Sequence, residues 1–471
     1  MKYHIFVLVW ASLFSLALSR PLNIGDLLKE ILENLKKHGG GGGSGGTPQC
    51  KNITNSLPAP GLADGYQSII AAKGLKSPRG MTFDSKGRLL IVDRGVGIKQ
   101  FTVDDCGLLT DSETIVADIS LNHGIDISGD GKTLFASNSD AAFAWTYNPN
   151  SGKVSKKVTL VTGMDSTDHV TRSLMVPSAN PNLLVISVGS NANIDNGTTE
   201  YSSGRSQIRG FMWKQIIASK KSVVFKESGV NLGWGLRNSV GITEDPAGNM
   251  WSVENSADNV ERDDIDIHTN NPGEELNFHG SLLDLTTPRP NYGYPRCLTA
   301  WDPSAVSTWT VKRGEQFAVN PTVNFTDETC NTDYEPPRLA FPAHSAPLDI
   351  RFTAGADAIV TFHGSWNRQP PTGYQLVSIP FDPMTGQPVA SSDSDAGFKP
   401  IMWNKDLTQC PGKCFRPTSI AISPLGALYM TSDSTGEVYR LTRGTSTGPT
   451  SPQNPTKPWW WPSWLPWPLN N

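Results

Sequence analysis

Six short segments of this 471-residue chain resemble one another, and an Arg or a His stands just before each of them. Each segment has a few alternating apolar residues, then a turn, then a second apolar run, which is typical of two β-strands joined by a tight turn. The six segments start at Gly80, Gly124, Ser173, Gly241, Leu348 and Ser419. Four of them have a glycine seven residues after the start, at Gly87, Gly131, Gly248 and Gly426. The repeat predicts an all-β fold, a six-bladed β-propeller with loop insertions.

The spacing of the segments fits propeller blades. The starts lie 44, 49, 68, 107 and 71 residues apart, and a four-stranded blade takes about 40–50 residues. The first blades are therefore nearly bare, and the largest insertion lies between Gly241 and Leu348. With 44 Gly, 35 Pro and only 18% charged residues, the composition also favours short strands and turns over long helices.

The basic residues before the six segments would meet at one face of a propeller, because its innermost strands begin around one axis. They are Arg79, His123, His169 with Arg172, Arg237, His344 and Arg416. Any one of them could be an ordinary surface charge, but six at the same place in a repeat indicate a site. A ring of cations and imidazoles suits a small, planar, polyanionic ligand. The net charge of −4 gives no basic field for nucleic acid.

The N-terminal region reads as an appendage to the repeats. Residues 1–19 predict a secretory signal, since Lys2 precedes an apolar run that ends near small residues. Residues 20–48 combine a short amphipathic helix with a Gly-rich linker. No later stretch is long and apolar enough to span a bilayer, so we expect a secreted, extracellular protein.

The propeller domain is expected at 49–443, followed by a Pro/Trp-rich tail at 444–471. Five Trp between prolines cannot form an ordinary helix or strand. The tail is either a stacking surface for sugars or another protein, or a segment that packs on the outside of the propeller.

Secretion makes the six cysteines readable as disulfides. Six cysteines allow fifteen pairings, and proximity in sequence favours Cys410–Cys414, Cys297–Cys330 and Cys50–Cys106. The spacings do not resemble paired zinc knuckles. Glycosylation sequons at Asn52, Asn196 and Asn324 fit an extracellular glycoprotein.

Three short motifs carry the candidate chemistry. In DHVTRSL, the imidazole of His169 could take a hydroxyl proton while Asp168 orients the substrate, although a structural histidine is the commoner case. GLRN, which ends at Asn238, places a guanidinium where it can stabilise charge on a carbonyl oxygen. ENSADN (Glu254–Asn259) offers loop carbonyls and carboxylates suited to calcium, or is simply a polar turn.

Further cations accompany the fifth and sixth repeats. The segment FHGSWNRQPPTGY follows the second strand of the fifth repeat and offers an aromatic surface beside cations, through His363, Trp366 and Arg368. At the sixth repeat, Lys413 and Arg416 add positive charge.

Together these motifs resemble the soluble quinoprotein sugar dehydrogenases, most closely the sorbosone dehydrogenase branch and its fungal pyranose dehydrogenases. The resemblance rests on the blade pattern with DHxTRSL, GLRN…EN, NYGYP, FPAHSAP, FHGSWNR…GY and FRPTSI, and it covers roughly residues 50–443. It implies a six-bladed propeller that holds pyrroloquinoline quinone (PQQ) and calcium near its axis.

The resemblance also implies roles for individual residues. The catalytic pair falls on His169 and Arg237, and the calcium-binding carbonyls fall on Ser256 and Ala257. Asp168 and His344 are expected to meet the substrate. Cofactor-binding positions are implied at Arg79, Arg172, Arg237, Asn238, His363, Trp366, Arg368, Lys413 and Arg416.

The implied reaction is oxidation of a small sugar at its anomeric carbon. His169 would remove the hydroxyl proton with an ionisation near neutral pH, hydride would pass to the quinone, and a lactone would form. His344 and His363 are competing candidates for the base. Electrons would leave to an external acceptor, such as a cytochrome or a copper oxygenase.

Two alternatives remain open beside the dehydrogenase. One is a calcium-dependent propeller lactonase, which would need carboxylates and amides rather than Arg and His at the tops of the inner strands. The other is a non-catalytic propeller that binds glycans.

Overall fold

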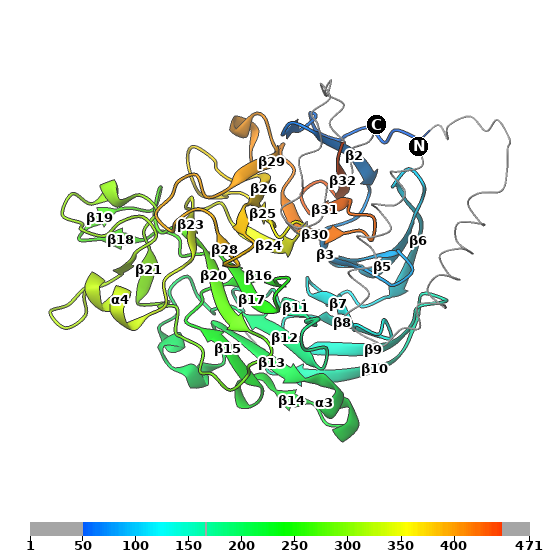
Figure 1. Cartoon of the computed structure of the whole chain (residues 1–471), viewed down its shortest axis with the longest axis horizontal. Helices are drawn as coiled ribbons and strands as arrows, with labels where there is room; N and C mark the ends of the chain where they lie inside the picture. The colour runs from blue at the N-terminus through cyan, green and yellow to red at the C-terminus, as the bar shows by residue number, and fades with distance from the viewer. Residues whose placement is uncertain (1–49, 165–166, 445–471) are drawn as a thin grey trace, which may run out of the picture. The chain divides into compact units, whose positions relative to one another are not determined.

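Six antiparallel sheets form the blades of a propeller in this computed structural model, which describes residues 50–164 and 167–444 (Figure 1). The prediction of an all-β, six-bladed propeller is confirmed. The predicted signal segment, amphipathic helix and linker, and the tail after Gly444, lie outside the described residues.

Blades 1 to 3 come from the first half of the propeller. Blade 1 contains β3 (Pro78–Phe83), β4 (Leu89–Asp93), β5 (Gly97–Val103) and β6 (Leu109–Val116). Blade 2 contains β7 (Ile125–Ile127), β8 (Thr133–Ser137), β9 (Ala142–Asn148) and β10 (Lys153–Thr162), with β14 (Val223–Val224) at its outer edge. Blade 3 contains β11 (Leu174–Met175), β12 (Leu183–Val188), β13 (Gln207–Met212) and β15 (Val230–Trp234).

Blades 4 to 6 complete the ring. Blade 4 contains β16 (Ser239–Glu244), β17 (Asn249–Glu254), β20 (Glu274–Ser281) and β23 (Leu339–Phe341). Blade 5 contains β24 (Pro347–Phe352), β25 (Ala358–Phe362), β26 (Gln375–Ile379) and β29 (Lys399–Trp403), with β1 (Gly61–Leu62) at its outer edge. Blade 6 contains β30 (Pro417–Ile422), β31 (Leu428–Ser432), β32 (Glu437–Arg443) and β2 (Tyr66–Ala72).

Smaller elements lie in the loops between these strands. Three two-stranded sheets pair β18 (Glu261–Arg262) with β19 (Ile265–Asp266), β21 (Cys297–Thr299) with β22 (Gln316–Ala318), and β27 (Phe381–Asp382) with β28 (Gln387–Pro388). The described α-helices are α3 (Trp213–Ser219) and α4 (Asp327–Asp333). Short 3₁₀ turns span Asn196–Thr199, Tyr201–Ser203, Phe225–Glu227, Pro303–Ala305 and Leu407–Gln409. Within the described residues, no helix has the length and apolar character needed to cross a membrane.

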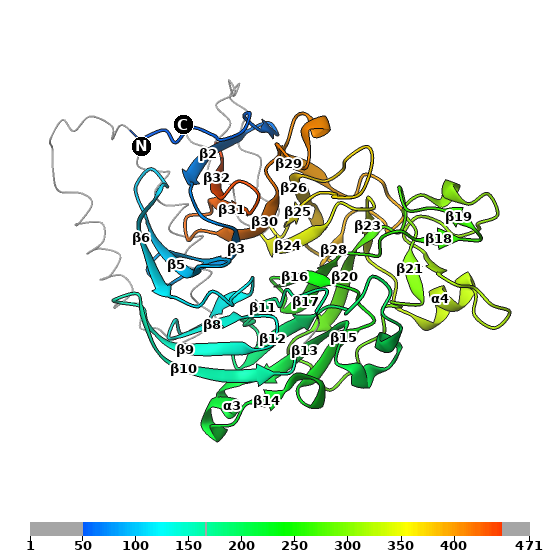
Figure 2. The ribbon, with the colours of Figure 1, turned by 180° about the vertical axis from the view of Figure 1, so that it is seen from behind.

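The six inner strands form a closed ring. β3 contacts β7 and β30, β11 contacts β7 and β16, and β24 contacts β16 and β30. The two opposite views show these strands gathered at the centre, with the outer strands of each blade around them (Figures 1 and 2). All six inner strands begin at the same face of the propeller and line its central axis. Their first residues therefore surround one opening.

The repeated glycines sit in the turn between the first and second strands of their blades, as predicted. In blade 1, the N–H of Gly87 donates to the carbonyl of Asp84 over 3.0 Å, and Gly87 has a φ of 79°. Gly131, Gly248 and Gly426 have φ values of 68°, 82° and 80°. This left-handed conformation is open to glycine at little steric cost.

A second set of glycines allows neighbouring inner strands to approach. A Cβ at Gly80 would overlap the carbonyl oxygen of His123, and one at Gly124 would overlap the carbonyl oxygen of Arg172. At Gly241 a Cβ would lie 2.9 Å from the Cα of Asp349, which is too close. Glycine is therefore required at these three of the six starts, because backbone from the next blade occupies the space of a side chain.

The insertion in blade 4 is pinned by a disulfide between Cys297 and Cys330, with Cα atoms 5.6 Å apart. A second disulfide joins Cys410 to Cys414. Both pairings are those expected from proximity. Cys50 and Cys106 are also disulfide-bonded.

We predict that Gly80→Ala lowers the free energy of unfolding by about 1–3 kcal/mol, because the added methyl group forces apart two inner strands. Urea denaturation should show this loss. Gly129→Ala is the matched control, since the nearest atom to a Cβ there is 4.0 Å away. Equal stability of the two variants would contradict the close-approach explanation.

Candidate active site

Two clusters of charged side chains lie around the opening where the inner strands begin. The first joins blades 1, 5 and 6, and the second joins blades 3, 4 and 5. We call them the Asp433 cluster and the Asp258 cluster, after the carboxylate at the centre of each.

In the Asp433 cluster, one carboxylate bridges two of the predicted cofactor residues. Nη1 of Arg79 lies 2.7 Å from one oxygen of Asp433, and Nε2 of His363 lies 2.9 Å from the other. Burial raises the pKa of Asp433, but the hydrogen bond and charge of His363, together with Arg79, bring it well below its usual range. Asp433 is therefore a fixed anion between two nitrogen donors.

Positive charge exceeds negative charge in this cluster. Arg416 donates from Nε to the carbonyl of His363 over 3.2 Å and from Nη2 to the carbonyl of Gly364 over 2.6 Å. Burial lowers the pKa of Arg79, as does repulsion from Arg94 and Arg416, against the attraction of Asp433. Nε of Arg79 is buried and has no hydrogen-bond partner in the described part of the chain. These observations indicate a cluster of side chains that favours an anion.

The Asp258 cluster holds Arg237 in a fixed position. The Arg237 guanidinium donates to the carbonyl and side-chain oxygens of Asn193, over 3.0 and 2.9 Å, and lies 3.6 Å from Asp258. Asp258 in turn accepts from Asn367 over 3.2 Å. The side chain of Arg237 is nearly buried, so its charge is anchored before any ligand binds.

His344 belongs to the same cluster and is held as a donor at both nitrogens. Nδ1 faces Asp258 at 3.2 Å, and Nε2 faces the carbonyl oxygen of His268 at 2.6 Å. Burial lowers the pKa of His344, but the hydrogen bonds to Asp258 and to the His268 carbonyl raise it above its usual value. Since both neighbours are acceptors, the charged imidazolium is favoured, and His344 is poorly suited to act as a base.

His169 is held in one tautomer. Its Nδ1 lies 3.0 Å from both the carbonyl oxygen and the hydroxyl oxygen of Ser190, and that hydroxyl donates to Ala192. Nδ1 therefore carries the hydrogen of the neutral ring, which leaves Nε2 as the atom that can accept a proton. No described residue makes a hydrogen bond to Nε2.

The pKa of His169 differs from the value expected from the sequence. Burial and the positive charge of Arg237 lower the pKa of His169 to about 4. The predicted ionisation near neutral pH is thus wrong for the ligand-free protein, because the neighbouring cation disfavours a second positive charge. Asp168 is about half exposed and lies 4.0 Å from Nδ1, too far for a hydrogen bond.

Asn238 and His169 both pack against Gly189. A Cβ on Gly189 would fall 2.8 Å from the Cβ of His169 and 2.7 Å from Oδ1 of Asn238. The carbonyl of Asn238 accepts from the backbone N–H of Asn255 over 3.1 Å, which links this corner to the ENSADN loop.

The ENSADN loop presents free backbone oxygens. Among the residues that the structure describes, none donates a hydrogen bond to the carbonyl oxygen of Ser256 or Ala257. The buried carboxylate of Glu274 fixes the loop from below, accepting from the N–H of Ser256 over 2.6 Å and from that of Ala346 over 3.2 Å. Burial raises the pKa of Glu274 to about 7. A cation bound by the loop would stabilise this anion.

Asp258, His268 and His344 lie close enough to converge on one metal ion, with ligand atoms within 4.8 Å of one another. Their hydrogen bonds argue against this use. His268 accepts from the N–H of Asn259 at Nδ1 over 2.8 Å, and its Nε2 lies 3.0 Å from the carbonyl of Asn367. With His344 donating at both nitrogens, neither imidazole offers a free lone pair.

Several predicted site residues lie outside the two clusters. Arg172 is fully buried, and its guanidinium donates to the backbone carbonyls of Met164, His169 and Thr171. It leaves no surface for a ligand and instead holds the loop that carries His169. Arg368 is likewise tied to the carbonyl of Thr269 and the side chain of Asn270.

The remaining predicted residues are exposed or unpaired. Lys413 is exposed in the small loop closed by Cys410 and Cys414, and the side chain of Trp366 is 69% exposed. His123 is buried on the axis, with Nδ1 unpartnered among the described residues, and burial and Arg79 lower its pKa well below the usual value.

Sequence reasoning missed the acidic residues that organise the site. Asp433 and Glu274 lie outside the sequence motifs described above. Asp258 belongs to one of them, ENSADN, but nothing in that motif distinguishes it from its polar neighbours. A weak signal exists for Asp433, because it directly follows the second strand of its repeat, β31.

Comparisons with known proteins give concordant findings. A family model described as TrAA12-like matches residues 60–444. A pyrroloquinoline quinone-dependent sugar dehydrogenase from Hypocrea jecorina (strain QM6a) is 42% identical over 407 residues, which cover 84% of this chain and 92% of that protein.

Two solved structures are also similar. The calcium structure of the Trichoderma reesei Carbohydrate-Active Enzymes Family AA12 protein has a TM-score of 0.81 at 43% identity, and the match covers 84% of this chain and 99% of that one. The holo form of the pyranose dehydrogenase PQQ domain from Coprinopsis cinerea has a TM-score of 0.79 at 38% identity, with the same two coverages.

We predict that Asp433→Asn destabilises the protein by about 1.5–3 kcal/mol at pH 6, because charge-assisted hydrogen bonds to Arg79 and His363 are lost. A carboxyl with a depressed folded-state pKa contributes stability that is complete above the unfolded pKa of about 3.8 and is lost as the pH falls through the lower folded value. The difference between wild type and variant should therefore shrink below about pH 4. Urea denaturation across this range tests it, and a constant difference would show that Asp433 does not titrate as inferred.

Proposed function

This chain belongs to the TrAA12-like family, and from that premise we propose that it is a PQQ-dependent sugar dehydrogenase. In this proposal it oxidises the anomeric carbon of a pyranose to a lactone with the help of calcium. Electrons then pass to an external acceptor, such as a cytochrome or a copper oxygenase. The observation that carries the proposal is the cation-rich Asp433 cluster at the same opening as His169 and the free carbonyls of the ENSADN loop.

The residues present fit a polyanionic quinone. Arg79 and Arg416 bring two guanidinium groups to one corner, where Asp433 and one imidazole are their neighbours. Nε of Arg79 has no partner among the described residues and needs an acceptor, and a carboxylate is the acceptor that a guanidinium binds best. We infer that these two arginines hold carboxylates of PQQ, with His363 kept in place by Asp433.

The ENSADN loop fits a hard cation. Calcium takes oxygen ligands, including backbone carbonyls, and those of Ser256 and Ala257 have no hydrogen-bond donor among the described residues. Glu274 adds negative charge behind the loop. Calcium bound here would polarise a carbonyl oxygen of its ligand.

The protein's part in the chemistry centres on His169. Nε2 accepts the proton of the anomeric hydroxyl. Nδ1 keeps its own hydrogen, which is hydrogen-bonded to Ser190 and fixes the orientation of the ring. When the hydroxyl oxygen loses this proton and the anomeric carbon loses its hydrogen as hydride, the carbon becomes the carbonyl carbon of a lactone. The quinone, when bound, supplies the two-electron chemistry. Arg237, anchored by Asn193, stabilises negative charge that develops beside it.

The rival bases suggested by the sequence are already engaged. His344 donates at both nitrogens, and Nε2 of His363 pairs with Asp433. The lactonase alternative would place carboxylates and amides at the tops of the inner strands, where this chain has Arg79, His123 and Arg416. The glycan-binding alternative predicts no dye reduction when sugar, PQQ and calcium are supplied.

The domain scheme is part of the same proposal. Residues 1–19 act as a secretory signal, 20–48 as an appendage, 49–443 as the dehydrogenase domain and 444–471 as the tail. The disulfides Cys297–Cys330 and Cys410–Cys414 are in keeping with an extracellular location.

We predict that PQQ binds tightly only when calcium is present, because the carbonyls of Ser256 and Ala257 would hold the cation, and the cation would attract the negatively charged quinone. Calorimetric titration with and without a chelator tests this, and equal affinities would refute the calcium role. Glu274→Gln should weaken calcium binding by about 10–100-fold, since it removes the anion behind the loop. Glu275→Gln is the matched control, because that buried carboxylate bonds Thr299 and Asn277 instead.

We predict that His169→Ala lowers kcat by about 10²–10⁴-fold while PQQ affinity and the melting temperature stay close to wild type, as removal of a general base does. His344→Ala and His363→Ala are the comparison variants, and we expect them to change cofactor affinity or stability as well. Near-normal turnover in His169→Ala would move the base elsewhere.

We predict that kcat/KM shows no loss attributable to His169 between pH 7 and 5, and falls on its account only near pH 4. A base must be unprotonated to act, and the pKa of His169 is lowered to about 4. Stopped-flow reduction of bound PQQ by sugar measures this limb, which His169→Ala should abolish. A limb near pH 6.5 would show that Arg237 does not depress the pKa as inferred.

A further inference from the structure

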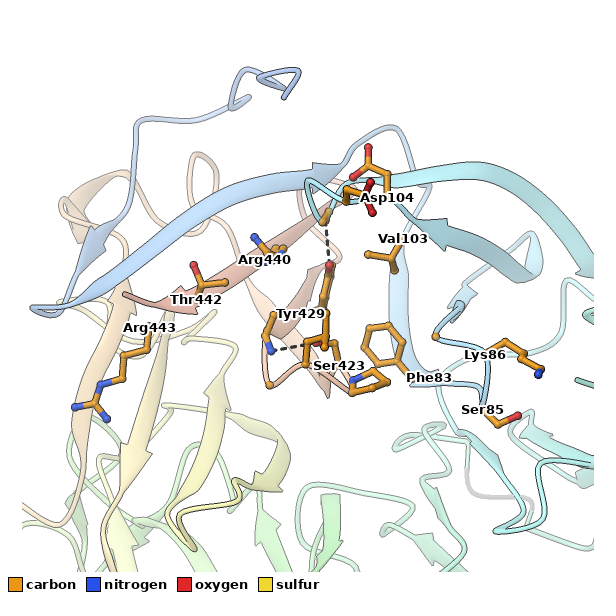
Figure 3. Close-up of a pocket in the computed structure, with 17 residues that line it drawn as sticks. Phe83, Ser85, Lys86, Val103, Asp104, Ser423, Tyr429, Arg440, Thr442 and Arg443 are labelled. Carbon is orange, nitrogen blue, oxygen red and sulfur yellow. Dashed lines mark hydrogen bonds between the residues drawn. The ribbon is translucent and has the colours of Figure 1, made fainter. Parts of the chain in front are cut away.

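A cavity of about 760 Å³ opens on the other face of the propeller, between blades 6 and 1 (Figure 3). Its walls come from the first turns of the two blades, the β5–β6 loop and the end of β32. The residues used below are Phe83, Asp104, Asp105, Leu425, Tyr429 and Arg443.

This cavity lies away from the site of the proposed reaction. Phe83 ends β3, whereas Arg79 near the start of the same strand faces the Asp433 cluster. The turn at Leu425 follows β30 in the same way, after Arg416 and the strand start. No residue of the two charged clusters lines the cavity.

The cavity combines apolar surface with hydrogen-bond acceptors. Phe83 packs edge-on against Tyr429, with ring centroids 5.5 Å apart, and the side chain of Leu425 is 97% exposed at the rim. Asp104 and Asp105 also line the cavity, and Asp105 is exposed. The cavity therefore has aromatic side chains on one side and carboxylates on another. This combination suits a ligand that has apolar faces and N–H donors.

The sequence of the chain contains such a segment after the last strand, β32, which ends at the cavity. Thr442 and Arg443 line the cavity, and Gly444 is the next residue. Fourteen residues, 445–458, then lead to five tryptophans within KPWWWPSWLPWPLNN. At about 3.3–3.6 Å per residue, a fourteen-residue connection reaches up to about 50 Å, so the tryptophans can return to the cavity.

The composition of this segment suits docking. Each indole has a large apolar face and one N–H donor, and Pro-rich segments bind aromatic-lined grooves because their extended form is already restricted. A tethered segment has an effective concentration of about millimolar, so even a weak intrinsic affinity keeps it bound. The family match ends at residue 444, so the tryptophans are additional to what this chain shares with the family.

We propose that residues 459–467 of the tail dock in this cavity, with indole rings on Phe83 and Leu425 and N–H groups toward Asp104 and Asp105. The tryptophans are then covered by the propeller that carries them. They cap the seam between the last and first blades, on the face away from the cation ring.

Hydrogen exchange measured by mass spectrometry on the full chain tests the proposal. Amides of 83–87, 103–107 and 423–427 should exchange at least about threefold more slowly than in a chain that ends at Arg443. That shorter chain is a fair reference, because 84% of this chain matches 99% of the Trichoderma reesei protein at a TM-score of 0.81. It should also keep full dehydrogenase activity on small sugars.

Leu425→Glu in the full chain should remove the protection, because a carboxylate replaces the apolar rim. Val323→Glu is the matched control, since Val323 is also 97% exposed but lies in the blade 4 insertion. A synthetic peptide of residues 456–471 should bind the shorter chain, and Leu425→Glu should abolish that binding.

Five results would overturn the proposal. Equal exchange in the two chains would show an empty cavity, and protection unchanged by Leu425→Glu would place the tail elsewhere. Protection that appears only with added cello-oligosaccharide, or only at high protein concentration, would assign the cavity to a saccharide or to a second copy. Loss of activity in a folded shorter chain would bring the tail to the active face.

Discussion

Closure of the blade ring is the constraint on which the site depends. β2, from the start of the propeller, pairs with β32 at its end, with Tyr66 opposite Arg443 and Ile70 opposite Tyr439. Blade 6 is thereby built from both ends of the domain and lies beside blade 1. The pair between Arg79 and Asp433 crosses this seam, joining residues 354 positions apart. An open ring would separate the two charges, so the fold and the cation cluster form together.

The cations at the ends of the inner strands divide into two groups by what holds them. Arg172 and Arg237 are bound by backbone carbonyls of neighbouring loops, and their charges are fixed inside the protein. Arg79 keeps a buried nitrogen without a partner among the described residues. The same residue type is thus fully tied to backbone oxygens in one blade and keeps a nitrogen without such a bond, within the described residues, in another. All three arginines are buried, so the difference lies in how many acceptors the neighbouring loops offer to each guanidinium.

The parts of the fold that could be predicted from the sequence are those set by local chemistry. Gly87 and its counterparts occupy tight turns because their φ angles are positive, and Cys410 and Cys414 pair because they are near in sequence. The acidic residues of the site had no comparable signal. Glu274 contacts Ser256 and Ala346, which are 18 and 72 residues away, through backbone N–H groups that any residue type provides.

The sequence alone determined the six-fold repeat and the position of the basic residues just before each inner strand, and it led to the proposal of His169 as base. These follow from strand periodicity and from the place of a residue in its repeat, both of which are local properties of the chain. Only the tertiary structure decided which of those residues are tied to backbone carbonyls, that the pKa of His169 is about 4 rather than near neutral, and that the basic residues gather in two clusters around Asp433 and Asp258. Such outcomes depend on burial and on charges from other blades, and distances between blades are fixed only when the ring is closed.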